Sequence, residues 1–222
     1  MASPSQSPSP QAHAADDTVR ARDSLPDELW FQILDELDYE GLHKAARLCK
    51  KVKAFIQDER FDDVLFRTKP PKKLPANSRV EIHPLLQATY CVFTKKDALT
   101  WASMGSDDSS EHTAFEYPAV DEFATVPACG IMNIDVGIGK KFPVTDRNGV
   151  KVRRLLQRLG HFWGQKPPAW MAYRIHGEYD VGPDEVTWQM MLGDRCGWTG
   201  WASAVVENEG KAVTLTADGY DS

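Results

Sequence analysis

The chain has 222 residues, of which 42% are hydrophobic, enough for one domain with a small second one or for a single large domain. Its 26 Lys and Arg residues are outnumbered by 32 Asp and Glu residues, which gives a net charge of −6. This balance argues against a general nucleic-acid binder, because such proteins carry a basic surplus that neutralises phosphates.

The distribution of hydrophobic residues predicts neither a membrane span nor a secretory signal. No apolar run approaches the roughly 18 residues of a membrane span, and residues 1–24 lack the apolar core of a secretory signal. We therefore expect no membrane partner and a location in the cytoplasm, the nucleus or both.

Residues 1–24 form a tail that the composition predicts to be disordered. Seven of the first ten residues are Ser or Pro, and the only aliphatic residues larger than alanine before Leu25 are Met1 and Val19. Such a segment buries too little apolar surface to offset the entropy that it would lose on ordering.

Residues 25–67 are predicted to form three short helices. Pro26 suits a first helical position, and Asp27 and Glu28 follow where the helix dipole favours acids. Asp38 is the expected N-cap of the second helix. The apolar face of the first helix has residues three and four apart, namely Trp30, Ile33, Leu34 and Leu37. The second helix repeats this spacing in Leu42, Ala45, Ala46 and Cys49, and the third contains Val52, Phe55 and Ile56.

This three-helix segment is too short to be expected to stabilise itself alone. Apolar residues also lie off the main stripes, at Leu25, Leu29, Phe31 and Leu48. Some of them need to be covered, either by the rest of the chain or by a partner protein.

Residues 68–78 are predicted to be an extended, polar linker, because they contain three prolines and three lysines. The basic stretch at residues 69–73 also allows a weak nuclear-signal reading, but a solvated linker is the better interpretation.

Residues 79–222 are predicted to form an α+β domain with a mostly antiparallel sheet and one main amphipathic helix. The expected strands cover residues 131–136, 141–145, 201–206 and 211–216. A turn at residues 146–149 precedes the helix, and Pro167-Pro168 stops it. The apolar face of this helix contains Val152, Leu155, Leu156, Leu159, Phe162 and Trp163.

The residues of the first module follow a known order as well as a helical period. The matching positions are Leu25-Pro26-Asp27-Glu28-Leu29, Ile33-Leu34, Leu37-Asp38, Leu42, Ala46, Leu48 and Lys50-Lys51. In this pattern the module resembles the F-box. It departs from the family at Val52, which usually is Trp, and at Tyr39, which often is Pro.

The resemblance implies a function without catalysis. F-box modules dock on the Skp adaptor, and through it on a cullin, in the SCF ubiquitin ligase, while the rest of the chain presents a protein substrate for ubiquitination. The residues expected at or next to the adaptor are Leu25, Pro26, Leu29, Ile33, Leu34, Leu37 and Leu42. The alternative for these side chains is an internal core, and the alternative for the chain is a free-standing interaction module whose F-box-like helices pack on its own C-terminal domain.

The second region is similar, more loosely, to an uncharacterised domain of fungal proteins. The similarity rests on residues 83–86, 124–127, 149–156 and 192–200. It implies a fungal source and a folded partner-binding domain, with no known activity.

Two groups of residues in the second region are candidates for substrate contact. On the main helix, Lys151, Arg154 and Arg158 are spaced to share a face that would suit phosphate or an acidic segment, the alternative being a solvated face. Trp198 and Trp201 flank a Gly-containing turn, and partly exposed aromatic residues there would suit a binding surface.

No catalytic, cofactor or metal site is expected. The histidines have no metal-ligand spacing, and His83, next to Pro84, is read as structural. The four cysteines lie 42, 38 and 67 residues apart, so they are expected to be reduced and mostly buried. Asp121 and Glu122 are interpreted as exposed loop charges.

Overall fold

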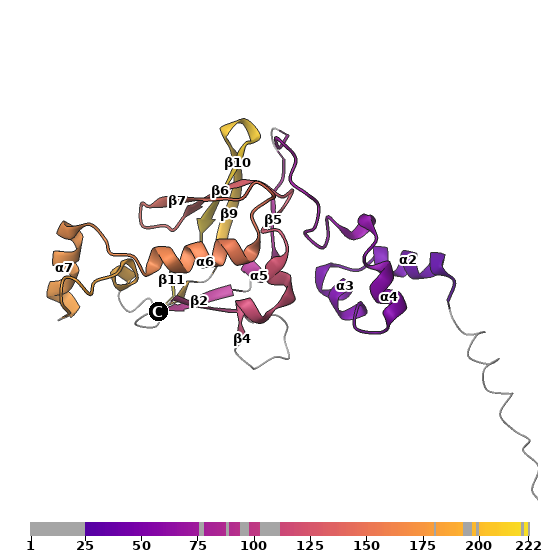
Figure 1. Cartoon of the computed structure of the whole chain (residues 1–222), viewed down its shortest axis with the longest axis horizontal. Coiled ribbons are helices and arrows are strands. Elements are labelled where there is room, and N and C mark those ends of the chain that lie inside the picture. The colour runs from indigo at the N-terminus through magenta and orange to yellow at the C-terminus, as the bar shows by residue number, and fades with distance from the viewer. Residues whose placement is uncertain are drawn as a thin grey trace, which may run out of the picture. The chain divides into compact units, whose positions relative to one another are not determined.

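The computed structural model describes residues 25–75, 78–87, 89–93, 98–102, 112–179, 181–192, 197–198, 200–218 and 220–221. The chain divides into two compact units, residues 1–58 and residues 59–222 (Figure 1). The predicted tail at residues 1–24 lies outside the described residues.

The first unit contains the three helices that the sequence predicts. They are α2 (Asp27–Asp35), α3 (Tyr39–Ala45) and α4 (Lys50–Phe55). The buried apolar side chains of this unit are Leu34, Tyr39, Leu42, Ala45, Val52 and Ile56. Each helix contributes to this small core, and Ile56 adds to it at the end of α4.

Short-range polar and aromatic contacts fix the three helices. The Asp38 side chain caps α3 by accepting a hydrogen bond from the Gly41 N–H at 2.8 Å, as predicted for an N-cap. Lys51 on α4 forms an ion pair with Asp27 in the first turn of α2, with 2.7 Å between the Lys51 Nζ and Asp27 Oδ1 atoms. The ring of Phe31 lies 4.9 Å from that of Phe55, which joins α2 to α4 a second time.

The second unit is built on β-sheets. One has the strand order β7-β6-β10-β9 and consists of β6 (Ile131–Asp135), β7 (Lys141–Thr145), β9 (Trp201–Glu207) and β10 (Ala212–Ala217). Another has the order β11-β8-β2-β3-β4 and consists of β2 (Thr89–Phe93), β3 (Ala98–Ala102), β4 (His112–Thr113), β8 (Gly197–Trp198) and β11 (Tyr220–Asp221). A short pair is formed by β1 (Glu81–Ile82) and β5 (Thr125–Val126). Among the strand pairs that the structure describes, β6 and β10 are parallel and the others antiparallel.

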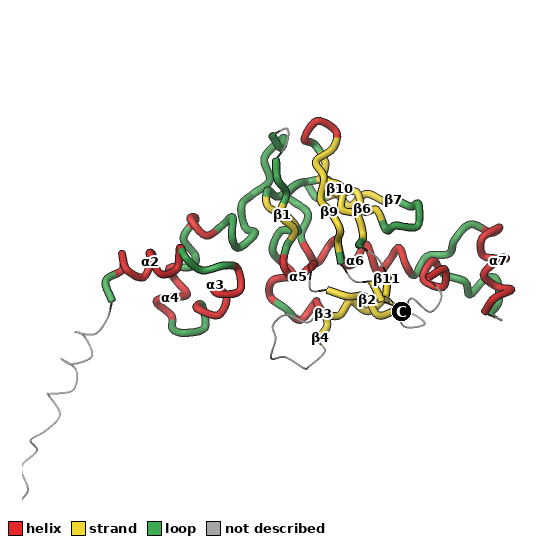
Figure 2. The backbone as a smooth tube through the Cα atoms, turned by 180° about the vertical axis from the view of Figure 1, so that it is seen from behind, coloured by secondary structure: helices red, strands yellow, loops and turns green. Residues whose placement is uncertain are grey.

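The helices of the second unit are α5 (Pro84–Gln87), α6 (Val152–Trp163) and α7 (Ala169–Tyr179). The 3-10 helices are η1 (Glu59–Phe61), η2 (Ala114–Glu116), η3 (Pro118–Asp121), η4 (Trp188–Leu192) and η5 (Asn208–Gly210). Helix α6 contacts β3 of one sheet and β7 of the other, and it crosses between the two sheets in both views (Figures 1 and 2).

The core of the second unit lies around α6. All six predicted apolar residues of this helix are buried. Phe162 stacks on Phe142 of β7 at 4.9 Å between ring centroids and on Trp188 of η4 at 5.7 Å. Facing side chains of the four-stranded sheet, Met132, Ile134, Val144, Val213 and Leu215, are also buried. Within the described residues, no helix is long and apolar enough to cross a membrane.

These observations confirm the predicted α+β class, the two predicted strand pairs and the main helix. Helix α7 is additional to the prediction. Helix α6 ends at Trp163, with Gly164 at its C-cap, before the predicted stop at Pro167-Pro168. Pro168 instead begins α7, because its carbonyl accepts hydrogen bonds from the backbone N–H groups of Met171 and Ala172 at 2.9 and 3.0 Å. The buried side of α7 then packs Ala172 and Ile175 against Val186.

The division between the units falls earlier in the chain than the predicted end of the first module at Arg67. Phe66 packs in the second unit, where its ring lies 4.6 Å from the His83 ring and its carbonyl accepts a hydrogen bond from the Phe123 N–H at 2.9 Å. Leu74, inside the predicted linker, is buried too, so that segment is not solvated throughout.

Candidate functional site

An exposed apolar ridge runs along α2 in the first unit. Leu25, Leu29 and Ile33 follow each other at intervals of four residues, and their exposed fractions are 40%, 42% and 47%. Residues four apart lie in one row on a helix surface, so Leu29 and Ile33 share one face of α2, and Leu25 lies just before the N-cap residue Pro26. Pro26 beside it is exposed as well. We call Leu25, Pro26, Leu29 and Ile33 the α2 ridge.

The side of α2 next to the ridge faces the core of the unit. Leu34 is 1% exposed, and Trp30, one turn earlier, is half-buried. The helix thus has two apolar faces, of which only one is covered by α3 and α4. Its first turn carries Asp27 and Glu28, which stabilise the helix dipole at the end where the ridge begins.

The seven residues expected at a partner surface differ in how far they are buried. The α2 ridge is exposed and Leu37 is half-buried. Leu34 and Leu42, however, are 1% and 0% exposed and are packed inside the unit. A side chain that is already buried has little surface left for a partner, so these two residues support the ridge from beneath.

The departure from the F-box pattern at Val52 concerns the core and not the surface. Val52 is 0% exposed in the middle of α4. A smaller side chain at this position therefore acts through the packing of the three helices. Leu48 is the most exposed large apolar residue of the unit, at 71%.

Residues 23–63 match the F-box domain. The match starts just before α2 and includes α2, α3 and α4. No curated protein and no solved structure matches the chain. The F-box supports a role in protein interaction, and F-box domains typically bind the Skp adaptor of SCF complexes as modules that are generally not catalytic.

In the second unit, two acidic residues read as loop charges have structural partners. His83 is fully buried, its Nε2 lies 3.0 Å from the Glu122 Oε2, and its Nδ1 accepts a hydrogen bond from the Leu85 N–H at 3.0 Å. Because Nδ1 accepts, the ring proton is on Nε2, where it is donated to Glu122. The pair fixes the start of α5, in keeping with a structural role for this histidine.

Asp121 anchors η3 to α6. Both of its carboxylate oxygens accept hydrogen bonds from Arg153, at 2.8 Å from Nε and 3.1 Å from Nη2. These bonds hold the pKa of Asp121 below its usual value. The folded carboxyl therefore loses its charge at a lower pH than the unfolded one, so the pair stabilises the fold above the unfolded pKa of about 3.9. This contribution disappears as the pH falls through the folded pKa.

Replacement of Asp121 by asparagine tests this ion pair. At pH 7, Asp121→Asn is expected to lower the free energy of unfolding by less than about 1 kcal/mol, since Asp121 is exposed to solvent and Arg153 is partly so. In urea denaturation, the difference between the two proteins should shrink as the pH falls below about 3.9, because the wild-type carboxylate then becomes protonated. A difference that does not shrink as the pH is lowered would contradict the assignment.

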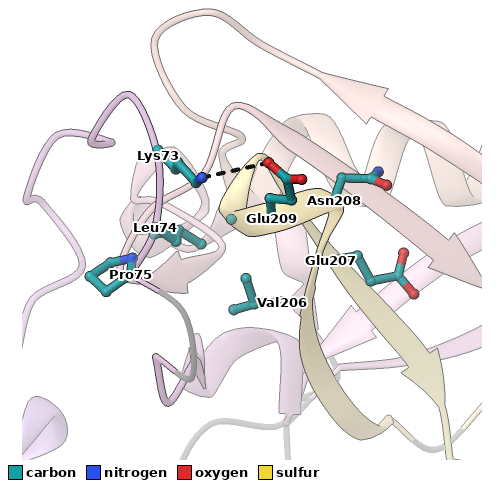
Figure 3. Close-up of a pocket in the computed structure, with 8 residues that line it drawn as sticks. Lys73, Leu74, Pro75, Val206, Glu207, Asn208 and Glu209 are labelled. Carbon is teal, nitrogen blue, oxygen red and sulfur yellow. Dashed lines mark ion pairs between the residues drawn. The ribbon is translucent and has the colours of Figure 1, made fainter.

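The segment before β1 is tied to the tip of the β9–β10 hairpin. The Leu74 N–H donates a hydrogen bond to the Gly210 carbonyl at 2.8 Å, and Lys73 forms an ion pair with Glu209 at 3.7 Å. In Figure 3, Val206 faces Leu74 across a pocket of about 630 Å³, and the dashed line marks the Lys73–Glu209 pair. A buried leucine and a backbone hydrogen bond therefore hold this part of the predicted linker in place.

The residues predicted to contact a substrate differ in their exposure to solvent. Arg154 and Arg158 are exposed on α6. Trp201 is only 8% exposed, so the expectation of an accessible tryptophan at this position is wrong: the side chain belongs to the core. The side chain of Trp198 lies outside the described part of the structure.

The described cysteines differ in exposure. Cys49 is exposed, contrary to the expectation of mostly buried thiols, whereas Cys129 is buried. Burial raises the pKa of the Cys129 thiol to about 11, so it stays protonated at neutral pH and is a poor nucleophile. The residues that the structure describes contain no group of three or more side chains arranged to hold a metal ion.

Proposed function

We propose that this protein is a substrate-recognition subunit of an SCF ubiquitin ligase. Its α2 ridge docks on the Skp adaptor, which connects it to a cullin, and its second unit binds a protein substrate. The observation that carries the proposal is the uncovered apolar ridge on a helix inside the F-box match. Apolar side chains in a stripe on a small unit are typical of a surface that a partner completes.

The proposed contact surface consists of the α2 ridge, with Leu37 at its edge. Leu34 and Leu42 contribute by holding α2 on the rest of the unit. Glu28 and the pair Lys50-Lys51 are exposed charges that would lie at the rim, where they influence the rate of association more than the affinity.

The proposed mechanism is tethering. A substrate held on the second unit has a raised effective concentration near the catalytic end of the ligase, so the chain needs no reactive group of its own. We place this activity in the cytoplasm or the nucleus. The proposal also includes a fungal origin and a second region that is similar to an uncharacterised fungal domain.

Co-expression with a fungal Skp adaptor tests the proposal. The wild-type chain is expected to co-purify with the adaptor, and Leu25→Ala/Pro26→Ala is expected to weaken the complex about tenfold or more, because truncation of a central apolar contact typically costs about 1–3 kcal/mol. Calorimetric titration gives the dissociation constants.

Absence of binding by a chain whose circular dichroism shows it to be folded would contradict the proposal. That result would favour the free-standing module, in which the F-box-like helices pack on the C-terminal domain of the same chain.

A further inference from the structure

A groove with basic walls lies on the second unit. It has a volume of about 930 Å³ and is open to solvent. One wall is the segment at residues 70–74, and a second wall contains the ends of β6 and β7 with the turn at residues 146–148. Arg154 of helix α6 and residues 210–211 of the β9–β10 hairpin line the rest of the groove.

Four cationic side chains from four separate segments line this groove. They are Lys72, Arg147, Arg154 and Lys211. All four are exposed, and within the described part of the chain none forms an ion pair with a carboxylate. The lining contains a single acidic residue, Asp146, whose Oδ1 accepts a hydrogen bond from the Asn148 N–H at 2.9 Å.

The positive charge is concentrated against the trend of the whole chain. The protein has a net charge of −6, yet this groove has four cations and one carboxylate. Cys129 in the lining adds no negative charge, because its thiol donates a hydrogen bond to the Ile131 carbonyl at 3.3 Å and stays protonated. A groove walled by one sign of charge focuses the field on a ligand of the opposite sign.

The groove also has apolar surface between its charges. Ile131 is 41% exposed and lies in the lining with Pro70 and Pro71. None of the lining residues is aromatic, so the groove offers no ring on which a nucleic-acid base would stack. Its cations come from four segments of the chain, which is more than one compact anion needs.

We propose that this groove binds an acidic, extended segment of a protein substrate, with carboxylates paired to the four cations and intervening side chains on Ile131 and the prolines. The inference rests on the proposed function in one respect: it takes the bound protein to be a substrate of the ligase.

The backbone contacts of the 70–74 segment keep the groove formed. The Leu74–Gly210 hydrogen bond fixes one end of this wall. Near the other end Pro70 packs close to Gly149, since a Cβ built on that glycine would lie 3.2 Å from the Pro70 Cδ. Lys72, between these two contacts, is thereby held at the groove.

Fluorescence anisotropy with a labelled twelve-residue peptide tests the proposal. The probe alternates glutamate with valine and serine, and its control has glutamine in place of every glutamate. The full-length wild-type chain is expected to bind the glutamate peptide at least about tenfold more tightly than the control, with an affinity that falls as salt is added.

Two matched charge reversals locate the site. Arg147→Glu/Arg154→Glu is expected to weaken peptide binding about tenfold or more. Arg158→Glu/Arg174→Glu changes the net charge equally at exposed positions outside the groove lining, and it is expected to weaken binding less than about twofold. If circular dichroism shows that the first variant is unfolded, Lys72→Glu/Lys211→Glu replaces it with the same expectation.

Three results would overturn the inference: equal binding of both peptides, equal losses in the two charge reversals, or tighter binding of a twelve-nucleotide single-stranded DNA through the same arginines. Adaptor co-purification on the same variants keeps this test separate from that of the proposed function. Lost peptide binding with retained adaptor binding supports the groove, whereas a wild-type chain that binds the peptide but fails to bind the adaptor contradicts only the docking proposal.

Discussion

Replacement of both Leu29 and Ile33 by glutamate is expected to abolish binding to the Skp adaptor. Both side chains are more than two-fifths exposed on α2, so the charges are accommodated in the free protein but would be desolvated in the complex. Loss of two apolar contacts and burial of two charges should lower the affinity about a hundredfold or more. Calorimetric titration of adaptor into the full chain measures this.

The control for this variant is Val205→Glu, on β9 of the second unit. Val205 is 52% exposed, so the same change is made at a similarly accessible apolar residue outside the α2 ridge. This control should bind the adaptor like wild type. Unchanged binding by Leu29→Glu/Ile33→Glu, with α2 still helical by circular dichroism, would show that adaptor docking does not use the ridge.

Replacement of Gly210 by alanine is expected to destabilise the second unit by about 2–4 kcal/mol. Gly210 has φ +88°, which a residue with a side chain rarely adopts, and a Cβ at this position would lie 2.1 Å from the Leu74 carbonyl oxygen. The clash is with backbone that is hydrogen-bonded to Gly210 itself, so relief would require breaking the Leu74–Gly210 contact. Urea denaturation gives the difference in free energy of unfolding.

Gly139 provides a control with the same conformational strain and no clash. Its φ is +72°, and a Cβ there would meet nothing within 4 Å. Gly139→Ala is therefore expected to cost only about 1 kcal/mol. If both variants lose the same stability, the close approach of Leu74 to Gly210 has no energetic weight and the 70–74 wall is not held by this contact.

The helices of the first unit follow from the sequence, but the division of their apolar residues does not. Ile33 and Leu34 are neighbours in the chain with similar hydrophobicity, yet one is 47% exposed and the other 1%. A helical period places both on an apolar stripe more than one residue wide. Which edge of the stripe is covered depends on the angle at which α3 and α4 pack, and that information is not local.

In the second unit, turn residues and apolar periodicity predicted the elements that are formed by neighbouring residues in the chain. The turn residues around Gly139 and the apolar period of α6 identified the β6–β7 hairpin and the main helix. The parallel pairing of β6 with β10 joins residues distant in the sequence, and no turn encodes it. The same reason explains Trp201: its place next to a turn suggested exposure, but pairing of β9 with β10 brings it into the core.

The groove illustrates the same limit for a candidate site. Arg154 was identified from its spacing on α6, but its neighbours in the groove, Lys72, Arg147 and Lys211, come from a linker, a turn and a hairpin end. Arg158, which shares the helical spacing, does not line the groove. Charge on one helix face was visible in the sequence, whereas the meeting of four segments required the fold.

Amide hydrogen exchange on the full-length chain, alone and with the Skp adaptor, tests the central claim most directly. Docking through the α2 ridge predicts that the adaptor slows exchange in α2 and leaves exchange in β6 and β10 unchanged. Exchange in α2 that is equally slow with and without the adaptor, or protection confined to the second unit, would contradict the account.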